Sequence, residues 1–360
     1  MDKKQPVVAF LGPRASYTHQ AAQSVFPPES HTLTPLMSIA DCFAAVQNDK
    51  ASYSVVPFEN SSNGAVVFTL DLLADIQGLC GDVVVTGEIY LPVHHCLVGR
   101  VSGGEGGGTQ AQSVSGSHDA TGLLEKEPTE SQQPHVRPTH DLSHIKKLYS
   151  HPQAWGQCKR FLSTHLKGIE QIDASSTSRA AELVAEDTTG TTAAISSKLA
   201  AEMSSLSVLA DSIEDFEGNS TRFFILQRRD AVSPPPRQRS TPQTSQSDPQ
   251  TQPPPEEASP APAYKSLLSF TVSHTIPGAL QRSLGAFNNH GINLTSINTR
   301  PSGEAAWHYI FLVEFEGRKG EGKVDEALKE LEGAARGWRW LGSWEAWRGG
   351  REGWDSVFEQ

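Results

Sequence analysis

The amino-acid sequence predicts an α/β protein made of two ordered blocks joined by a polar segment. Three observations support this prediction. Short apolar runs alternate with amphipathic runs through the first block, a stretch rich in proline and glutamine follows it, and the second block has a βαββαβ order of its own. With 360 residues, 37% of them hydrophobic, the chain is long enough for two or three domains with real cores.

Composition narrows the classes of partner. The formal net charge is −11, whereas a protein that binds nucleic acid needs a basic surface, so we expect no nucleic-acid partner. A small anionic ligand is still allowed, because a few local donors outweigh a distant field. The sequence has no apolar run long enough to span a membrane and no signal-peptide stretch before Pro6, so we expect no membrane association.

The cysteines and histidines give no metal signature. The spacing of the four cysteines fits no metal site, so we expect reduced thiols and a cytoplasmic protein. The run His94-His95-Cys96 lies within one predicted strand, and three consecutive strand residues cannot converge on one ion. We therefore expect no metal. The cysteines are Cys42, Cys80, Cys96 and Cys158.

Two segments of biased composition set the boundaries. Residues 230–263 are almost all Pro, Ser, Gln, Thr and charge, which predicts a disordered Pro-rich linker because too little apolar surface is present to offset the ordering entropy. Residues from about 102 to 140 are glycine-rich, and no helix pattern or Lys-Ser/Thr pair follows the glycines, so a low-complexity insertion is favoured over a phosphate loop. The ordered blocks are then 6–229 and 264–347.

The first block repeats a unit of strand, polar turn and helix. In an open α/β sheet such turns meet at the carboxyl ends of the strands, where free N–H groups at helix N-termini favour an anion. The pattern thus predicts an anion-binding cleft, although each hydroxyl taken alone is better explained as a helix cap. The predicted strands of these units are 7–11, 52–58, 146–149, 169–174 and 192–195, and a further strand is expected at 220–227.

The second block predicts a ferredoxin-like domain. A module of this size exposes the edges of its sheet, so we expect a homodimer or a homotetramer. Its tryptophans fit either an interface or the core. The expected elements are strand 267–272, helix 277–288, strands 292–298 and 307–315, helix 324–331 and strand 338–344, and the tryptophans are Trp338, Trp340, Trp344 and Trp347.

Several short motifs resemble those of prephenate dehydratases that carry a C-terminal ACT regulatory domain. Each motif alone is weak, but the set covers both blocks in the expected order. In chain order the motifs are Gly12-Pro13 with Ser16-Tyr17-Thr18-His19, Val56-Pro57-Phe58-Glu59-Asn60-Ser61, Ser150-His151-Pro152-Gln153 with Gln157-Cys158, Ser176-Thr177-Ser178, Asn219-Ser220-Thr221-Arg222-Phe223, Pro277-Gly278-Ala279-Leu280 and Arg300-Pro301.

The resemblance implies a two-lobed catalytic domain, similar to a periplasmic binding protein, with the site between its lobes. The first lobe would span about 6–91 and 207–229, the second about 92–206, and the ACT domain 264–347. The implied reaction is the decarboxylating dehydration of prephenate to phenylpyruvate in L-phenylalanine biosynthesis. The cyclohexadiene ring takes the electrons and expels its hydroxyl, so the resemblance implies no cofactor.

Residue roles are carried over from the matching motifs. Thr221 would assist the departing hydroxyl; without the motif it is an ordinary strand threonine. Arg222 would bind a carboxylate or have a structural role, and Phe223 would line the site or the core. The implied substrate-binding residues are Ser16, Thr18, Glu59, Asn60, Ser61, Ser150, Gln157, Ser176, Thr177, Arg222 and Phe223.

The resemblance also implies that L-phenylalanine binds the ACT domain and lowers activity. Asn298 stands where the family has the acid of a Glu-Ser-Arg-Pro motif, so we expect weaker inhibition. The implied effector-binding residues are Gly278, Ala279, Leu280, Asn293, Leu294, Asn298 and Arg300.

Two other functions stay open at this point. Arogenate dehydratases perform the same chemistry on the aminated substrate, and the sequence does not separate the two. A non-catalytic sensor that binds a small acid between two lobes is the second alternative. We expect a single activity, because no helical mutase-type segment precedes Val7.

Overall fold

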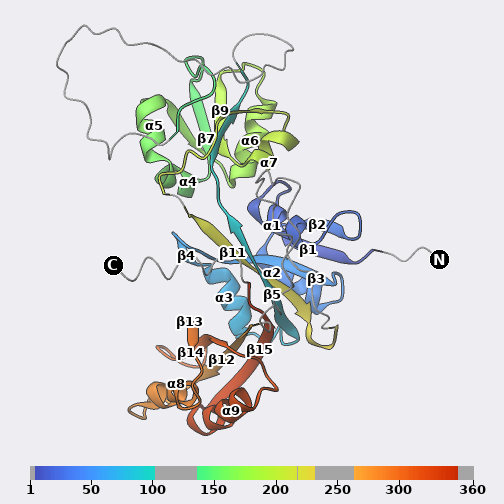
Figure 1. Cartoon of the computed structure of the whole chain (residues 1–360), viewed down its shortest axis with the longest axis vertical. Coiled ribbons are helices and arrows are strands. Elements are labelled where there is room, and N and C mark those ends of the chain that lie inside the picture. The colour runs from blue at the N-terminus through green and yellow to red at the C-terminus, as the bar shows by residue number, and fades with distance from the viewer. Residues whose placement is uncertain (1–4, 102–135, 217, 232–262, 348–360) are drawn as a thin grey trace, which may run out of the picture. The chain divides into compact units, whose positions relative to one another are not determined.

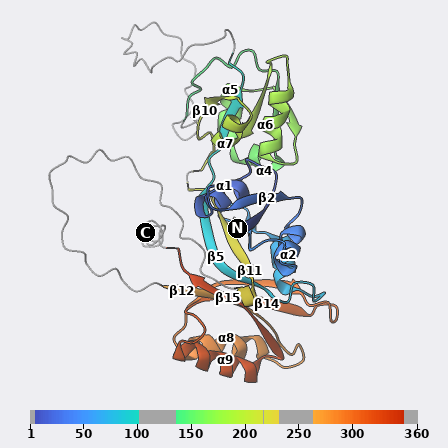
Figure 2. The same cartoon turned by 90° about the vertical axis from the view of Figure 1, so that its right-hand side faces the viewer.

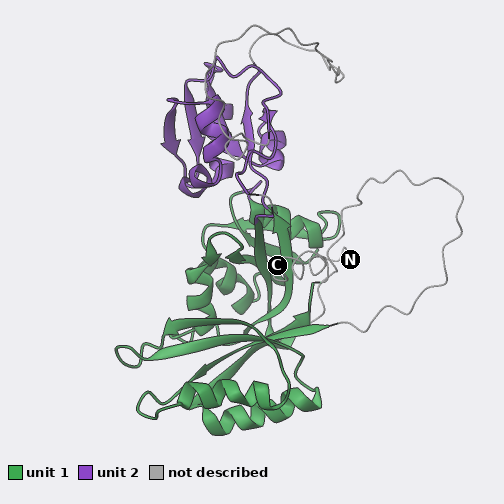
Figure 3. Cartoon of the chain, turned by 60° about the vertical axis from the view of Figure 1, so that its left-hand side comes forward, with its two compact units in different colours: residues 1–13, 17–92, 220–360 green, residues 14–16, 93–219 purple. Residues whose placement is uncertain are grey.

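The computed structural model describes residues 5–101, 136–216, 218–231 and 263–347 (Figure 1). Most of the predicted insertion (102–135) and almost all of the predicted linker (232–262) lie outside the described residues. The rest divides into two compact units, coloured separately in Figure 3. The first unit comprises 1–13, 17–92 and 220–360, and the second comprises 14–16 and 93–219.

The predicted boundary of the first lobe is wrong at its second crossing. We expected the chain to return to this lobe at 207, but it returns at Ser220. The strand β10 (Ser207–Ala210) pairs antiparallel with β6 (Cys96–Gly99), and Leu209 and Ala210 are buried in the second unit. An apolar run such as 208–210 suits either core, so the sequence gives no sign of which sheet it joins.

The N-terminal lobe of the first unit, described over 5–13, 17–92 and 220–231, is built around strand β11 (Ser220–Arg228). This strand lies between β3 (Tyr53–Asn60) and β5 (Val83–Pro92) and is antiparallel to both. Beyond β3, the parallel strands β1 (Val7–Leu11) and β2 (Thr32–Leu36) complete this side of the sheet. Strand β1 therefore begins and ends as predicted, whereas β2 was not predicted.

Alternation along β11 divides the core into two layers. Phe223 and Ile225 pack towards helix α1, and Phe224 and Leu226 pack on the opposite face, towards α2 and α3. The helices, which connect the strands, are α1 (Tyr17–Val25), α2 (Ile39–Gln47) and α3 (Val67–Ala74), and the two-residue strand β4 (Gly64–Ala65) pairs with β3.

The C-terminal domain has the predicted βαββαβ order, and every predicted element is present within a few residues. Helices α8 and α9 lie side by side on one face of its sheet (Figure 2). The sheet order is β13-β14-β12-β15, and the elements are β12 (Tyr264–Thr271), α8 (Ala279–Asn289), β13 (Leu294–Pro301), β14 (Tyr309–Glu316), α9 (Gly322–Ala334) and β15 (Gly337–Glu345).

The opposite face of this sheet packs directly on the N-terminal lobe. Trp344 is 2% exposed and contacts the ring of Phe224 edge-on, so the core interpretation holds for this tryptophan. Strand β15 joins β5 at Gly342 and Val85. Gly342 has φ 140°, and a Cβ there would lie 2.0 Å from the carbonyl oxygen of Val85, so only glycine permits this junction.

The second unit contains a five-stranded sheet with the order β10-β6-β9-β7-β8. The helix predicted over 153–165 is instead two helices, which meet at Cys158. The carboxylate of Asp215 accepts the N–H groups of Lys159 and Arg160 at 2.9 Å each, and this cap starts the second helix. The remaining elements are β7 (Lys147–Ser150), α4 (Pro152–Gln157), α5 (Lys159–His165), β8 (Glu170–Asp173), α6 (Thr177–Glu186), β9 (Thr192–Ser196) and α7 (Lys198–Met203).

Within the described ranges, no helix has the length and apolar character needed to cross a membrane.

Candidate active site

The predicted catalytic threonine meets a predicted substrate-binding amide across two strands. Thr221 on β11 is the register partner of Asn60 at the end of β3. The Asn60 Nδ2 group donates to Thr221 Oγ1 at 3.0 Å and to the carbonyl of Ser220 at 3.1 Å. Its Oδ1 accepts the N–H groups of Ser62 and Asn63, both at 3.0 Å. Asn60 is therefore held at both ends of its amide and fixes the position of the threonine hydroxyl.

This arrangement leaves the Thr221 hydroxyl suited to donate. Its oxygen accepts a hydrogen bond from Asn60, so the O–H proton points away from that partner. A hydroxyl that accepts one hydrogen bond is a stronger donor of the next. Thr221 is half-buried, so its donor is partly shielded from water. The pair can stabilise negative charge that develops on a departing oxygen.

Ser61 extends the same pair of strands. Its N–H donates to the Ser220 carbonyl at 2.9 Å, and its Oγ accepts the Ser220 N–H at 3.0 Å. The serine side chain thus replaces a backbone acceptor beyond the end of β3. In this structure Ser61, like Asn60, positions the strand that carries Thr221.

Arg222 is buried and surrounded by carboxylates. Its side chain is 5% exposed; Nη1 donates to Glu59 at 2.9 Å, and Nη2 contacts Glu88 at 2.9 Å and Glu314 more closely. Three carboxylates bind the guanidinium of Arg222. This favours the structural role over substrate binding, the two roles that the sequence left open. Phe223 is 1% exposed in the core around α1, the second of its two expected roles.

The charges of this cluster stabilise one another. Burial alone would lower the pKa of Arg222, but the neighbouring carboxylates, led by Glu314, outweigh it and raise that pKa. Burial alone would raise the pKa of Glu314, but Arg222 and Lys265 hold it below its usual value. Burial likewise opposes the charge of Lys265, and Glu88 and Glu314 raise its pKa. All three groups therefore keep their charge at neutral pH.

The other predicted substrate residues are mostly parts of helix starts and strand ends. Thr18, on α1 of the first unit, is 5% exposed. In the second unit, Ser150 is fully buried and donates to the Ile195 carbonyl at 3.3 Å. Ser176 caps α6 by accepting the N–H of Arg179 at 3.0 Å. This is the helix-cap role that the sequence offered as the alternative to substrate binding. Two further predicted substrate residues are half-buried: Ser16, which precedes α1, and Thr177, which begins α6.

Gln157 has a partner that the sequence did not reveal. The Nε2 atom of His95 lies 2.7 Å from Gln157 Oε1. His95 is 3% exposed; burial lowers its pKa, so the ring is neutral near pH 7. Its backbone N–H donates to Glu214 at 2.9 Å, which holds the segment just before β6. The run His94-His95-Cys96 was expected within one strand, but only Cys96 belongs to β6.

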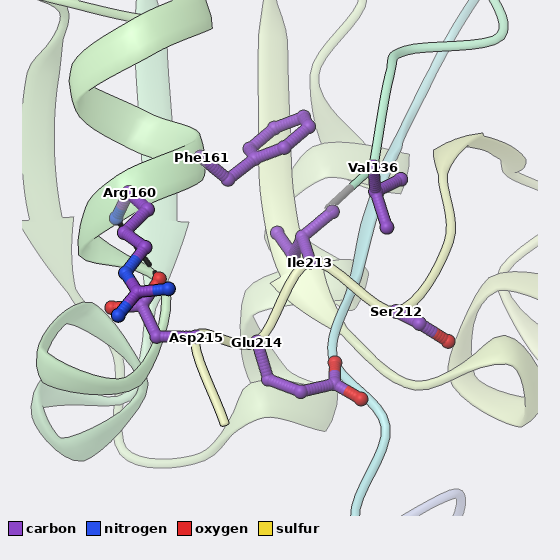
Figure 4. Close-up of a pocket in the computed structure, with 7 residues that line it drawn as sticks. All are labelled: Val136, Arg160, Phe161, Ser212, Ile213, Glu214 and Asp215. Atoms are coloured by element: carbon purple, nitrogen blue, oxygen red, sulfur yellow. Dashed lines mark hydrogen bonds between the residues drawn. The ribbon is translucent and has the colours of Figure 1, made fainter. Parts of the chain in front are cut away.

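A small hollow in the second unit lies beside this network (Figure 4). Figure 4 shows the carboxylate of Glu214 pointing away from Arg160 and Asp215. None of the residues that line the hollow is a predicted site residue, and its acids already hold backbone N–H groups of His95, Lys159 and Arg160. The lining residues are Val136, Arg160, Phe161, Ser212, Ile213, Glu214 and Asp215.

The predicted effector residues fall into two groups. Gly278, with φ 75°, is the exposed N-cap of α8, while Ala279 and Leu280 pack into the core beneath that helix. In the second group, Asn298 donates from Nδ2 to the Ser296 hydroxyl at 3.1 Å. Arg300 pairs with Asp71 of α3 at 2.5 Å and so reaches the N-terminal lobe. Asn293 is exposed and Leu294 is half-buried.

In the part of the chain that the structure describes, no group of three or more His, Cys, Asp or Glu residues is arranged to hold a metal ion.

Comparison with known proteins identifies both blocks. A family model described as prephenate dehydratase matches residues 8–110 and 131–231, and one described as ACT domain matches 266–333. A relative from Aquifex aeolicus, named bifunctional chorismate mutase/prephenate dehydratase, is 32% identical over 95% of this chain and 74% of its own.

Two solved structures are similar over nearly the whole length. The prephenate dehydratase from Arthrobacter aurescens, described in complex with L-Phe, is 26% identical with a TM-score of 0.68, covering 94% of this chain and 90% of its own. A chain described as GqqA, a novel type of quorum quenching acylase, is 25% identical with a TM-score of 0.67, covering 95% of this chain and 98% of its own.

Proposed function

The chain belongs to the prephenate dehydratase family, and we propose that it converts prephenate to phenylpyruvate, carbon dioxide and water. The observation that carries this proposal is the Asn60–Thr221 hydrogen bond within two of the matching motifs. This hydrogen bond holds a hydroxyl that can donate to the departing oxygen of the substrate.

The predicted site residues have different roles in the proposed reaction. As the carbon–carbon bond to the ring carboxylate breaks, carbon dioxide is released and the electrons of that bond enter the ring. The ring C–O bond breaks, and the hydroxyl leaves with its electron pair as hydroxide, which takes one proton from solvent to become water. Thr221 donates a hydrogen bond to that oxygen, and Asn60 holds Thr221 in place. We propose that the helix-start hydroxyls Ser16 and Ser176, with Gln157, bind the substrate carboxylates. The ring supplies the electron sink, so the protein provides orientation and electrostatic stabilisation.

The test is the formation of phenylpyruvate from prephenate by the purified full-length chain, followed by chromatography. Arogenate, tested in parallel, separates the two dehydratase activities, because arogenate yields phenylalanine instead. Binding of prephenate without turnover would support the sensor alternative and reject the proposal. Hydrolysis of an acyl amide with no turnover of prephenate would indicate the activity named for the similar acylase.

We propose further that L-phenylalanine binds the ACT domain and lowers the rate. The similar structure described in complex with L-Phe supports this proposal. The exposed start of α8 has no side-chain cap at Gly278, which leaves space for the amino acid's carboxylate at the positive end of the helix. Initial rates with and without millimolar L-phenylalanine test it, and equal rates would reject it.

The assembly and the compartment are also proposals. Strand β13 stands at the end of the sheet order and has the exposed side chain of Ile297, which supports a homodimer or homotetramer formed through this edge. Light scattering measures the mass. Cytoplasmic location is supported by the four cysteines, all free and buried.

A further inference from the structure

Five charged side chains from the two domains of the first unit form one cluster. Besides the three carboxylates on Arg222, Lys265 Nζ lies 3.4 Å from Glu88 and 3.5 Å from Glu314. Three of the members are almost fully buried: Glu88 and Glu314 have side chains that are 0% and 1% exposed, and that of Arg222 is 5% exposed. The N-terminal lobe provides Glu59, Glu88 and Arg222, and the C-terminal domain provides Lys265 and Glu314.

Arg222 connects this cluster to the catalytic strand pair. In the register of β11 with β3, Arg222 lies opposite Glu59, and the next pair is Thr221 opposite Asn60. The Arg222–Glu59 ion pair and the Thr221–Asn60 hydrogen bond are therefore consecutive links across the same two strands. Arg222 and Thr221 are adjacent in β11, so the carboxylates that bind Arg222 hold the strand directly beside the hydroxyl that we propose to act in turnover.

We propose that Glu314, although it belongs to the C-terminal domain, is a positioning residue for the dehydration. It binds the Nη2 end of Arg222 together with Glu88, while Glu59 binds the Nη1 end, and of these three carboxylates only Glu314 comes from the C-terminal domain. Charge-assisted hydrogen bonds to a planar guanidinium fix its orientation as well as its place. This inference rests on the proposed function, because positioning has meaning only if Thr221 acts in turnover.

Glu314 is itself oriented from the regulatory side. Thr295 Oγ1 donates to Glu314 Oε1 at 2.6 Å. Thr295 lies on β13, which also carries the predicted effector residues Leu294 and Asn298. A change in β13 thus reaches Arg222 through two contacts. The same contact that positions the catalytic strand also joins it to the strand expected to sense the effector.

Other contacts between the C-terminal domain and the N-terminal lobe supply a matched control. Arg339 pairs with Asp75 at 3.0 Å and also donates to the Leu73 carbonyl at the end of α3. It crosses between the same two domains with an ion pair to a buried acid, but it does not touch β11. Arg339→Gln weakens the attachment of the domain and leaves the Arg222 cluster intact.

The experiment compares the steady-state kinetics and thermal stability of full-length Glu314→Gln and Arg339→Gln. Glu314→Gln reduces the three carboxylates of the cluster to two, which matches its two cations, so we expect the fold to be retained. We expect kcat for prephenate to fall roughly tenfold with KM changed by less than about threefold, since the substrate-binding groups stay in place. Arg339→Gln should lower the melting temperature but keep kcat.

A milder variant keeps the proposal testable if Glu314→Gln does not fold. Thr295→Val removes only the hydrogen bond to Glu314 and leaves every charge, and we expect a two- to threefold lower kcat, on the order of one lost neutral hydrogen bond at a distance from the reaction. Unchanged kcat in both cluster variants, or an equal fall in Arg339→Gln, would overturn the proposal. Absence of turnover in the wild-type chain would reject the proposed function instead, so the two failures are distinguishable.

Discussion

The predicted site residues of the first unit and those of the second unit are held in different ways. In the first unit Asn60 bonds Thr221 and Glu59 pairs with Arg222, while Ser61 bonds Ser220, the neighbour of Thr221. In the second unit the hydroxyls serve separate helix starts and strand ends, and Gln157 is tied to a histidine rather than to another predicted residue. An interlocked set is suited to hold a reacting group in one place, whereas a set of helix starts is suited to bind anions. We therefore propose that the first unit carries out the chemistry and that the second binds the substrate carboxylates.

The strongest way to break this assignment is to remove the hydroxyl of Thr221. Thr221→Ala should lower kcat by roughly two to four powers of ten, the range for loss of a proton-donating group, with a much smaller change in KM. Thr221→Ser keeps the hydroxyl and loses the methyl group that fixes its rotamer, so a smaller loss is expected. Initial rates with prephenate measure both.

An alanine variant with near-normal kcat would remove Thr221 from the chemistry and with it the division between the units. Thr69→Val is the matched control for this substitution. Thr69 is a buried threonine of the same unit, and its hydroxyl donates to the Pro57 carbonyl at 2.6 Å rather than to a residue of β11. Loss of that hydroxyl should lower stability and leave kcat in place.

Substitution of Gln157 tests whether the second unit binds the substrate carboxylates. Gln157→Leu removes an amide that we assign to carboxylate binding and keeps the size of the side chain. We expect KM for prephenate to rise roughly tenfold, the cost of about one charge-assisted hydrogen bond, with kcat changed less. A fall in kcat with constant KM would place Gln157 in the chemistry instead and weaken the contrast between the units.

The sequence predicted the regular parts of the fold well. The strand 7–11 and the whole βαββαβ order followed from local patterns, because turn residues and apolar periods are set by neighbours in the chain. The break at Cys158 and the return at Ser220 did not, because each depends on a partner distant in sequence: Asp215 for the first and β6 for the second.

The same distinction applies to the site. Motifs pointed to Thr221 and Asn60, which the structure brings together. The acids that occupy Arg222 come from three distant segments, so nothing near Arg222 in the sequence indicates them. The contact of His95 with Gln157 was missed for the same reason, since it spans 62 positions of the chain.

The smallest expected effect is on the pH dependence of stability, through His95, the residue that contacts Gln157. Burial lowers the pKa of His95 below the value of about 6.5 that a histidine has in an unfolded chain. Between these two pKa values the unfolded chain binds more protons than the native protein, so the free energy of unfolding falls as the pH drops from about 6.5 towards the native pKa. His95→Gln does not titrate and its amide can still bond Gln157, so this variant should lose that part of the pH dependence. Urea unfolding from about pH 5 to 8 measures the slope for both chains. Equal slopes would mean that His95 has the same pKa in the folded and unfolded chains. The interpretation of His95 as a buried, neutral ring that supports Gln157 would then be wrong.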